Sequence, residues 1–308
     1  MSLVADVLSG AVRGGTSIMY AGLGETVSEK AGVVNLGTEG CMLVGALGGF
    51  ATAYSTGSPW LGVLVAAIAG GLLAAIHAVL VIGRGANQFA SGLTLLFFAL
   101  GLTSLYGAGY VGKEIHALNP IAIPGLSDIP FLGPILFDQD ALTYLSYFTA
   151  PALFLLMVKT RPGLLLRTAG ERAEVLTVHG YRISTVRYAA VIGGGMLSGI
   201  GGAHLSIAYA QSWFENMIVG RGFIAVALVI FASWQPIRVM AGAYLFGAAL
   251  ALSPALQARG VDLPVLNNQF ALDVLPFVVT LLVLAFLGKR TLLAAPDELR
   301  KVFDNTAS

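Results

Sequence analysis

Few side chains in this 308-residue chain belong to types that could do covalent or metal chemistry. Cys41 lies in an apolar run with no histidine nearby, which favours a packed side chain over a nucleophile. The histidines lie in different segments and lack metal-ligand spacing, so the sequence predicts no metal site. They are His77, His116, His179 and His204. These residue types together predict a protein with no catalytic site of its own.

A glycine-rich segment at 107–113 has the spacing of a phosphate-binding loop. In a P-loop, the residue after the lysine is a serine or threonine that holds magnesium, but here Glu114 follows Lys113. The segment also ends an apolar run, whereas a nucleotide loop follows a strand. We therefore expect these glycines to serve a turn or close helix packing, and we expect this chain to bind no nucleotide cofactor.

Two clusters of polar side chains accompany the apolar runs. In the first, Asn35 and Glu39 are four residues apart, so they share one face if the segment is helical. In the second, Asn87, Gln88 and Ser91 stand between two apolar runs. Amide groups can both donate to and accept from a neutral polar solute. Two interpretations stay open for each cluster, because such residues can line a transport path or can cap and join helices.

The segment 159–187 is the most basic part of the chain, with six basic and two acidic residues. Its portion from Arg167 to His179 has helical propensity and ends before Gly180, a residue type that can stop a helix. Glu171 and Glu174 are three residues apart and would share a helical face. Such a helix could lie among lipid headgroups or dock a cytoplasmic partner. Its short apolar set, at 175, 176 and 178, favours docking.

The composition indicates an integral membrane protein. Hydrophobic residues make up 56% of the chain and charged residues 11%, against roughly 25% charged residues in soluble domains. The mean hydropathy is +0.82, and the 39 glycines are typical of closely packed membrane helices. A formal net charge of +1 gives no indication of nucleic-acid binding. We expect an all-α transmembrane bundle in which residues 1–308 form one domain.

Apolar windows of about 20 residues, the length that crosses a bilayer, predict nine spans. They lie at 4–24, 33–54, 59–82, 89–109, 142–158, 188–210, 219–235, 238–254 and 274–288. The loop 159–187 has a charge balance of +4 and the loop 110–141 a balance of −3. Because basic loops stay in the cytoplasm, the first should face inward and the second outward. The amino terminus is then outside and the tail 289–308 inside.

Arg13, His204 and Arg221 are among the charged or ionisable side chains within these predicted spans. Arg13 weakens the first span, which is also rich in glycine. We expect His204 to form a hydrogen bond between helices, and Arg221, near the outer face, to snorkel towards water.

The order of the polar segments resembles that of bacterial ABC importer permeases for simple sugars and nucleosides. Residues 25–40, ETVSEKAGVVNLGTEG, resemble the amino-terminal signature of this family, and residues 85–92, GANQFASG, resemble its second block. Residues 170–180, GERAEVLTVHG, are similar to its cytoplasmic coupling segment, although they depart from the Glu-Ala-Ala pattern of other importers. Further blocks match at 220–225 and 275–280. The resemblance covers about residues 20–288.

The resemblance implies a permease subunit of an ATP-driven importer in the bacterial inner membrane, closest to permeases that work with nucleoside-binding lipoproteins. Its implied partners are a second permease, often a paralogue, a cytoplasmic ABC ATPase that holds ATP and magnesium, and an extracytoplasmic solute-binding protein or lipoprotein. We expect the substrate path to include Asn35, Glu39, Asn87, Gln88 and Ser91. We expect ATPase coupling to involve Arg167, Gly170, Glu171, Glu174 and Gly180.

Two other functions remain open from the sequence. Permeases of ribose-type sugar importers share these blocks more loosely. An ion-coupled secondary transporter would need acidic residues inside its spans and would need no docking loop.

Overall fold

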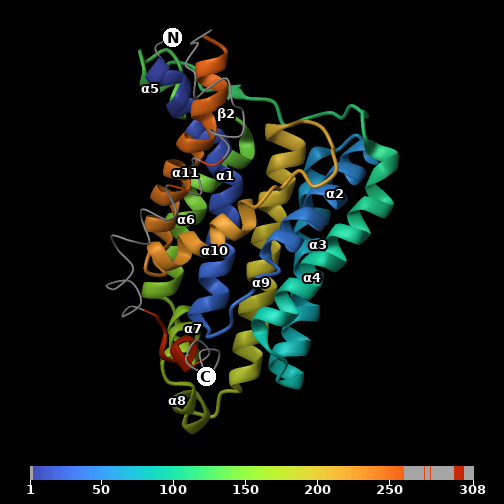
Figure 1. The fold of residues 1–308 in the computed structure, drawn as a ribbon. Helices are drawn as coiled ribbons and strands as arrows, with labels where there is room; N and C mark the ends of the chain where they lie inside the picture. Colours follow the sequence, from blue (N-terminus) through green and yellow to red (C-terminus); the bar gives the residue numbers. More distant parts are fainter. Residues whose placement is uncertain (1–2, 260–273, 275–277, 279–294, 302–308) are drawn as a thin grey trace.

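The computed structural model describes residues 3–259, 274, 278 and 295–301, which form a bundle of long helices (Figure 1). Helix α9 (Ile183–Ala203) contacts α1 (Leu3–Lys30), α2 (Thr38–Thr56) and α3 (Pro59–Ala78). Helix α4 (Gln88–Gly107) packs on α2, whereas α6 (Ala141–Lys159) and α11 (Pro236–Gln257) pack on α1. Helix α9 thus separates two groups of helices and forms the centre of the bundle.

Short elements complete the bundle. Two π-helical turns, η1 (Val79–Gly83) and η3 (His204–Tyr209), continue α3 and α9. The short η2 (Ala108–Tyr110) follows α4, and the predicted outer loop contains α5 (Leu132–Leu136) and two short strands, β1 (Ile121–Ala122) and β2 (Asp138–Gln139). The strands pair antiparallel, with Ile121 opposite Gln139 and Ala122 opposite Asp138. The glycine-rich segment at 107–113 follows α4, as predicted, and no strand precedes it within the described part of the chain.

Five helical segments are long and apolar enough to cross a membrane, which confirms a helical membrane domain. They are Pro59–Gly83, Gln88–Tyr110, Ala141–Lys159, Ile183–Tyr209 and Pro236–Gln257. Helices α1 and α2, with 28 and 19 residues, coincide with the first two predicted spans but are less apolar. The predicted span 274–288 lies almost entirely outside the described residues. The number of nine spans therefore stays a prediction.

The structure differs from the prediction at 219–235, where α10 (Arg221–Phe231) has only 11 residues. A helix of this length rises about 16 Å, roughly half of a hydrocarbon core of about 30 Å. Backbone breaks limit it at both ends, because Gly220 has a φ of 79° before the helix and Ser233 has a φ of 51° after it. The apolar run predicted as a complete span is thus a half-helix with turns on either side.

The basic segment forms two helices where the sequence predicted one. Helix α7 (Arg161–Glu171) ends at Arg172, whose φ of −146° and ψ of 78° interrupt the helical hydrogen bonds, and α8 (Ala173–Val178) follows. Gly180 stands just beyond α8 with a left-handed φ of 78°, and its N–H donates to the Thr177 carbonyl at 3.0 Å. The predicted glycine stop is confirmed, whereas the continuous helix from Arg167 to His179 is wrong.

Candidate transport path and coupling surface

The 31–37 link, the non-helical segment between α1 and α2, turns back into the bundle after α1. At its centre the Val34 N–H donates to Gln88 Oε1 at 2.7 Å, and the Val34 carbonyl lies 2.9 Å from His77 Nε2. The other nitrogen of His77 lies 3.0 Å from Ser91 Oγ. Val34 is buried, so these side chains supply the hydrogen bonds that a helix or sheet would otherwise provide. The second polar cluster therefore fixes the link.

The end of the link is held by a buried carboxylate of α1. Glu25 Oε1 accepts the Asn35 N–H at 2.7 Å, and Glu25 Oε2 accepts the Thr38 hydroxyl at 2.8 Å. The Asn35 side chain shapes the turn itself, because its Oδ1 accepts the Gly37 N–H at 2.9 Å. Asn35 and Glu25 together set where α2 begins.

Glu39, in the first turn of α2, binds the amino terminus of α10. Its Oε1 accepts the Gly220 N–H at 2.8 Å, and its Oε2 accepts the Phe223 N–H at 3.3 Å. The first N–H groups of a helix have no partner within the helix, and its positive end favours an anion. The two backbones touch at this point, since a Cβ on Gly222 would lie 2.4 Å from Glu39 Cα. Glu39 therefore fastens the half-helix to α2.

The contacts of α10 place its start at the middle of the bundle. Arg221 donates to Ser17 Oγ at 3.2 Å, and Ser17 lies halfway along α1. The Arg221 guanidinium also lies 5.4 Å from the centroid of the Tyr209 ring. Beyond the other end of α10, the Trp234 indole N–H donates to Glu29 Oε2, close to the end of α1. The predicted snorkelling of Arg221 is wrong, because its guanidinium contacts Ser17 of α1 and the Tyr209 ring instead.

The backbone that enters α10 is strained. Gln211, Asn216 and Val219 have φ values of 53°, 55° and 47°. A positive φ is unusual for any residue with a side chain and is an outlier for a β-branched one such as Val219. Strained backbone of this kind clusters at functional sites. The 210–220 segment and the 31–37 link are both non-helical. Glu39, two residues after the link, binds Gly220 at the end of the 210–220 segment.

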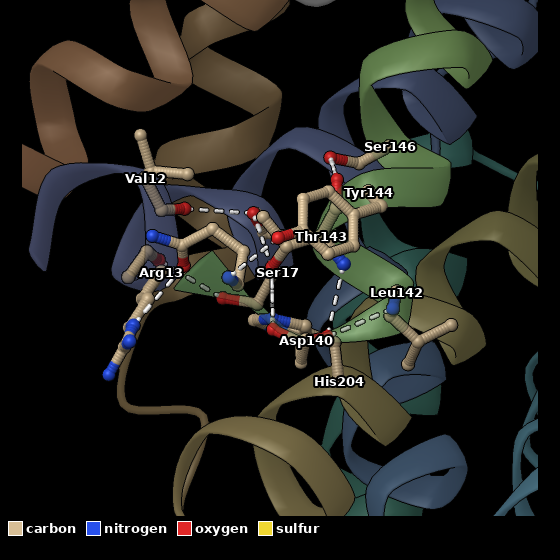
Figure 2. A network of polar contacts seen from close by, with 12 residues as sticks. Val12, Arg13, Ser17, Asp140, Leu142, Thr143, Tyr144, Ser146 and His204 are labelled. Carbon is tan, nitrogen blue, oxygen red and sulfur yellow. Dashed lines mark hydrogen bonds and ion pairs between the residues drawn. The ribbon is translucent and has the colours of Figure 1, made fainter. Parts of the chain in front are cut away.

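A second buried polar network joins the start of α6 to η3 and α1 (Figure 2). His204 Nε2 lies 3.2 Å from Thr143 Oγ1 and 3.4 Å from Asp140 Oδ2. The Thr143 hydroxyl donates to the same Asp140 oxygen at 2.6 Å. These contacts confirm the prediction that His204 connects helices. Arg13 is accommodated in α1 nearby, where its Nε donates to Gln139 Oε1 at 3.1 Å.

The structure brings most of the predicted path residues to the same region. Asn35 and Ser91 are buried and Gln88 is half-buried around the 31–37 link, and Glu39 lies at the adjoining contact with α10. Asn87 differs, because it is exposed and its Oδ1 accepts the Ala90 N–H at 3.0 Å as the cap of α4. Their role in transport stays a prediction, since the contacts described here are hydrogen bonds within the chain.

Sequence reasoning missed three residues of this region, namely Glu25, Glu29 and His77. The two glutamates stand in the first polar segment, one helical turn apart, and both are buried. Their presence in a helix at membrane depth was an available signal, because buried acids need dedicated partners. His77 gave a weaker signal in the sequence, since its partners, Ser91 and the Val34 carbonyl, come from distant parts of the chain.

The predicted coupling residues lie at the opposite end of the bundle from the outer loop (Figure 1). Glu171 and Glu174 are exposed on either side of the break at Arg172, and both line a cleft of about 440 Å³ beside the 295–301 segment. A second cleft of about 430 Å³ lies between α7 and α8. Two apolar side chains that line it are exposed, Leu164 at 56% and Val175 at 39%. This end thus presents both acidic and apolar surface.

Two other coupling residues are partly or fully covered. Arg167 is half-buried. Gly170 packs on the end of α1 so closely that a Cβ would lie 2.3 Å from the Lys30 carbonyl oxygen. Gly170 therefore fixes α7 against α1 and contributes little surface.

Comparison with known proteins places the chain in a family. Residues 7–285 match the family described as branched-chain amino acid transport system / permease component. The chain is 39% identical to TsgC13 of Haloferax volcanii, named as a glucose ABC transporter permease, over 99% of both chains. It is 35% identical to the nucleoside ABC transporter permease NupC of Lactococcus lactis over 89% of this chain and 90% of that protein.

A further relative is the guanosine ABC transporter permease NupQ of Bacillus subtilis, 33% identical over 88% of this chain and 89% of that protein. No solved structure gives a significant match. The family match covers all helices from α2 to α11 and most of α1. The chain therefore belongs to the family of ABC transporter permease components described as branched-chain amino acid transport system / permease component.

Proposed function

We propose that this chain is the membrane permease of an ATP-driven importer that moves nucleosides, or related neutral sugar-containing solutes, into the cell. The observation that carries the proposal is the similarity along most of the chain to permeases named for nucleosides and guanosine, at 35% and 33% identity. In this account the chain has no catalytic site, and a partner ATPase binds ATP and magnesium. A solute-binding protein or lipoprotein delivers the solute from outside.

The proposed path runs beside the two non-helical segments that Glu39 bridges, next to Asn35, Glu39, Asn87, Gln88 and Ser91. Irregular backbone at membrane depth is tolerated where it is buried in protein or lines a cavity, and transporters place solute sites at broken helices near the midplane. The half-helix α10 and the strained 210–220 segment fit this pattern. The amides and hydroxyls of the path suit a neutral solute better than fixed charges would.

The test of the path is a triple alanine variant at Asn87, Gln88 and Ser91, assayed for solute uptake. Loss of one hydrogen bond to the solute costs about 0.5–1.5 kcal/mol, so uptake should fall by up to about tenfold per bond. Thr94→Ala on the exposed side of α4 is the matched control. Unchanged uptake by a well-assembled triple variant would remove these residues from the path.

We propose that α7 and α8 dock the ATPase. Their exposed apolar side chains and the acidic pair Glu171 and Glu174 could meet a partner with apolar and basic surface. The combined change Glu171→Arg and Glu174→Arg should abolish ATPase co-purification and uptake. The matched control is Glu114→Arg with Asp128→Arg, the same change in charge on the loop predicted to lie outside. Normal uptake by the first variant would refute docking and favour a surface helix.

We propose nine spans in the bacterial inner membrane, with the amino terminus outside, and a paralogous permease as partner. The charge balances of the two long loops support this orientation. Its test is labelling of Asp128→Cys and Thr177→Cys from each side of the membrane. Native Cys41 is buried and should not react. The first cysteine should label only from outside and the second only from inside; the reverse result would invert the topology.

A hexose is the second candidate solute, because the relative at 39% identity is named as a glucose permease. Binding of guanosine, ribose and glucose to the partner solute-binding protein, measured by calorimetry, separates the candidates. Nucleoside binding with no binding of free sugars supports the first proposal. Tight glucose binding with no nucleoside binding supports the second.

A further inference from the structure

Arg187, near the start of α9, connects three segments that are far apart in the sequence. Its Nε donates to the Ala31 carbonyl at 3.1 Å. A terminal nitrogen donates to the Ala169 carbonyl at 3.2 Å and to Glu298 Oε2 at 2.9 Å. The planar guanidinium offers five donors in a fixed fork, so one side chain can hold two backbone carbonyls and a carboxylate together.

The 295–301 segment, coloured red in Figure 1, lies at the end of the bundle that carries α7 and α8. Leu299 and Ala295 are buried, with exposed fractions of 0% and 3%. Glu298 also lies against the link, because a Cβ on Gly32 would be 2.9 Å from Glu298 Cβ. Lys301 donates to the second oxygen of Glu298 at 2.7 Å. The packed 295–301 segment therefore holds Glu298 in place beside the Arg187 side chain.

The partners of Arg187 belong to the two functional regions. Ala169 lies in α7, the proposed docking helix, and Ala31 is the first residue of the 31–37 link. Beside this contact, Gly170 of α7 touches the Lys30 carbonyl, so no side chain separates the two backbones. From Ala31 the link continues to Val34, which Gln88 and His77 hold. A displacement of α7 therefore has a short and packed route to the proposed path.

We propose that Arg187 is a positioning residue that transmits motion of α7 to the 31–37 link, with the 295–301 segment as its support. The proposal rests on the proposed docking of the ATPase at α7 and α8. A change at Arg187 should leave the ATPase and the proposed path intact but weaken the coupling between them. The expected defect is ATP hydrolysis without the corresponding solute transport.

The experiment uses proteoliposomes that contain the complete importer with its ATPase and solute-binding protein. We would measure ATPase co-purification, ATP hydrolysis, and the amount of solute transported per ATP hydrolysed. Arg187→Gln should retain the ATPase and lower transport per ATP by about fivefold or more, the effect of losing about 1 kcal/mol of coupling. Arg187→Lys keeps the charge without the fork, so it should restore part of the loss. The matched control is Arg182→Gln, an exposed position one turn earlier.

If the assembled Arg187→Gln complex transports as much solute per ATP as the wild type, the proposal is overturned. A lower amount of complex with an unchanged ratio would also overturn it, because that result indicates stability alone. If Arg187→Gln does not assemble, Glu298→Gln decides, since its side chain is 21% exposed and the change removes the charge facing Arg187 and Lys301 while leaving the bonds from Arg187 to Ala31 and Ala169 in place. That variant should lower the ratio in the same direction, and a wild-type ratio would refute the role. A failure of the proposed docking at α7 and α8 gives a different result. In that case the ATPase would co-purify with the Glu171→Arg and Glu174→Arg variant as well as it does with the wild type.

Discussion

The contact between Gly222 and Glu39 gives the sharpest prediction about the start of the half-helix. In Gly222→Ala, the new Cβ would lie 2.4 Å from Glu39 Cα and 2.6 Å from Glu39 Cβ and N. Carbon atoms in contact prefer about 3.5–4.0 Å, so α2 and α10 must separate by about 1 Å. All three of these Glu39 atoms belong to or adjoin the backbone, so rotation of a side chain cannot relieve the clash.

The separation should also break the hydrogen bonds at this point. The Gly220 N–H lies 2.8 Å from Glu39 Oε1 and the Phe223 N–H lies 3.3 Å from Oε2. An extra 1 Å or so takes the first distance well beyond the usual limit of about 3.2 Å and breaks the second, which is already at that limit. Overpacking alone costs about 1–3 kcal/mol, and a hydrogen bond to a charged group contributes about 1.5–3 kcal/mol. Because rearrangement recovers part of this, we expect a destabilisation of about 3 kcal/mol.

The assay is thermal unfolding of the purified permease in detergent, with uptake measured on the same variant. Gly101→Ala in α4 is the control, since no atom lies within 4 Å of its new Cβ, and a helical glycine-to-alanine change alters stability by about 1 kcal/mol or less. Gly222→Ala should unfold at a clearly lower temperature than Gly101→Ala and lose uptake. Equal unfolding temperatures for the two variants would refute the close contact between α2 and α10.

Two further predictions concern the link and its support. Ser91→Ala removes the partner 3.0 Å from His77 Nδ1 and should destabilise the protein by about 1–3 kcal/mol, whereas Ser55→Ala on the exposed end of α2 should have little effect in the same unfolding assay. For Glu298, burial alone would raise the pKa of the carboxyl, but hydrogen bonds from Lys301 and Arg187 outweigh it and hold the pKa below its usual range. A lowered pKa in the folded state means that this carboxylate stabilises the protein above the unfolded pKa of about 4.3 and that the contribution is lost as pH falls through the folded pKa. The difference in unfolding temperature between wild type and Glu298→Gln should therefore be constant from pH 7 to 6 and shrink in acid below the unfolded pKa; a difference that grows in acid would contradict the assignment.

The sequence alone predicted the helical membrane class because that information is local. Runs of apolar residues gave helices such as α3 and α6, and the charge of 159–187 marked a segment that differs from the spans. Gly180 was a sufficient signal for the end of α8, because glycine can adopt a left-handed φ without steric cost.

The breaks in the helices could not be predicted in the same way. The run at 219–235 is mostly apolar, and α10 ends just before Trp234, which reaches Glu29, a partner 205 residues away. Arg221 likewise turns inward because Ser17 of α1 is there to accept its hydrogen bond. The split between α7 and α8 falls at Arg172, whereas the nearest glycine, Gly170, lies inside α7 and does not mark the break. In each case a contact between distant segments, or one residue in an extended conformation, overrides the local pattern.

The central claim is that this chain is the permease of an ATP-driven nucleoside or sugar importer. The most direct measurement is uptake of radiolabelled guanosine and glucose into proteoliposomes that contain the permease pair, the ATPase and the solute-binding protein. An ATP-driven importer should take up one of these solutes only when ATP is present on the same side of the membrane as the ATPase, and a proton or sodium gradient should have no effect. Uptake that follows an ion gradient and continues without the ATPase would contradict it.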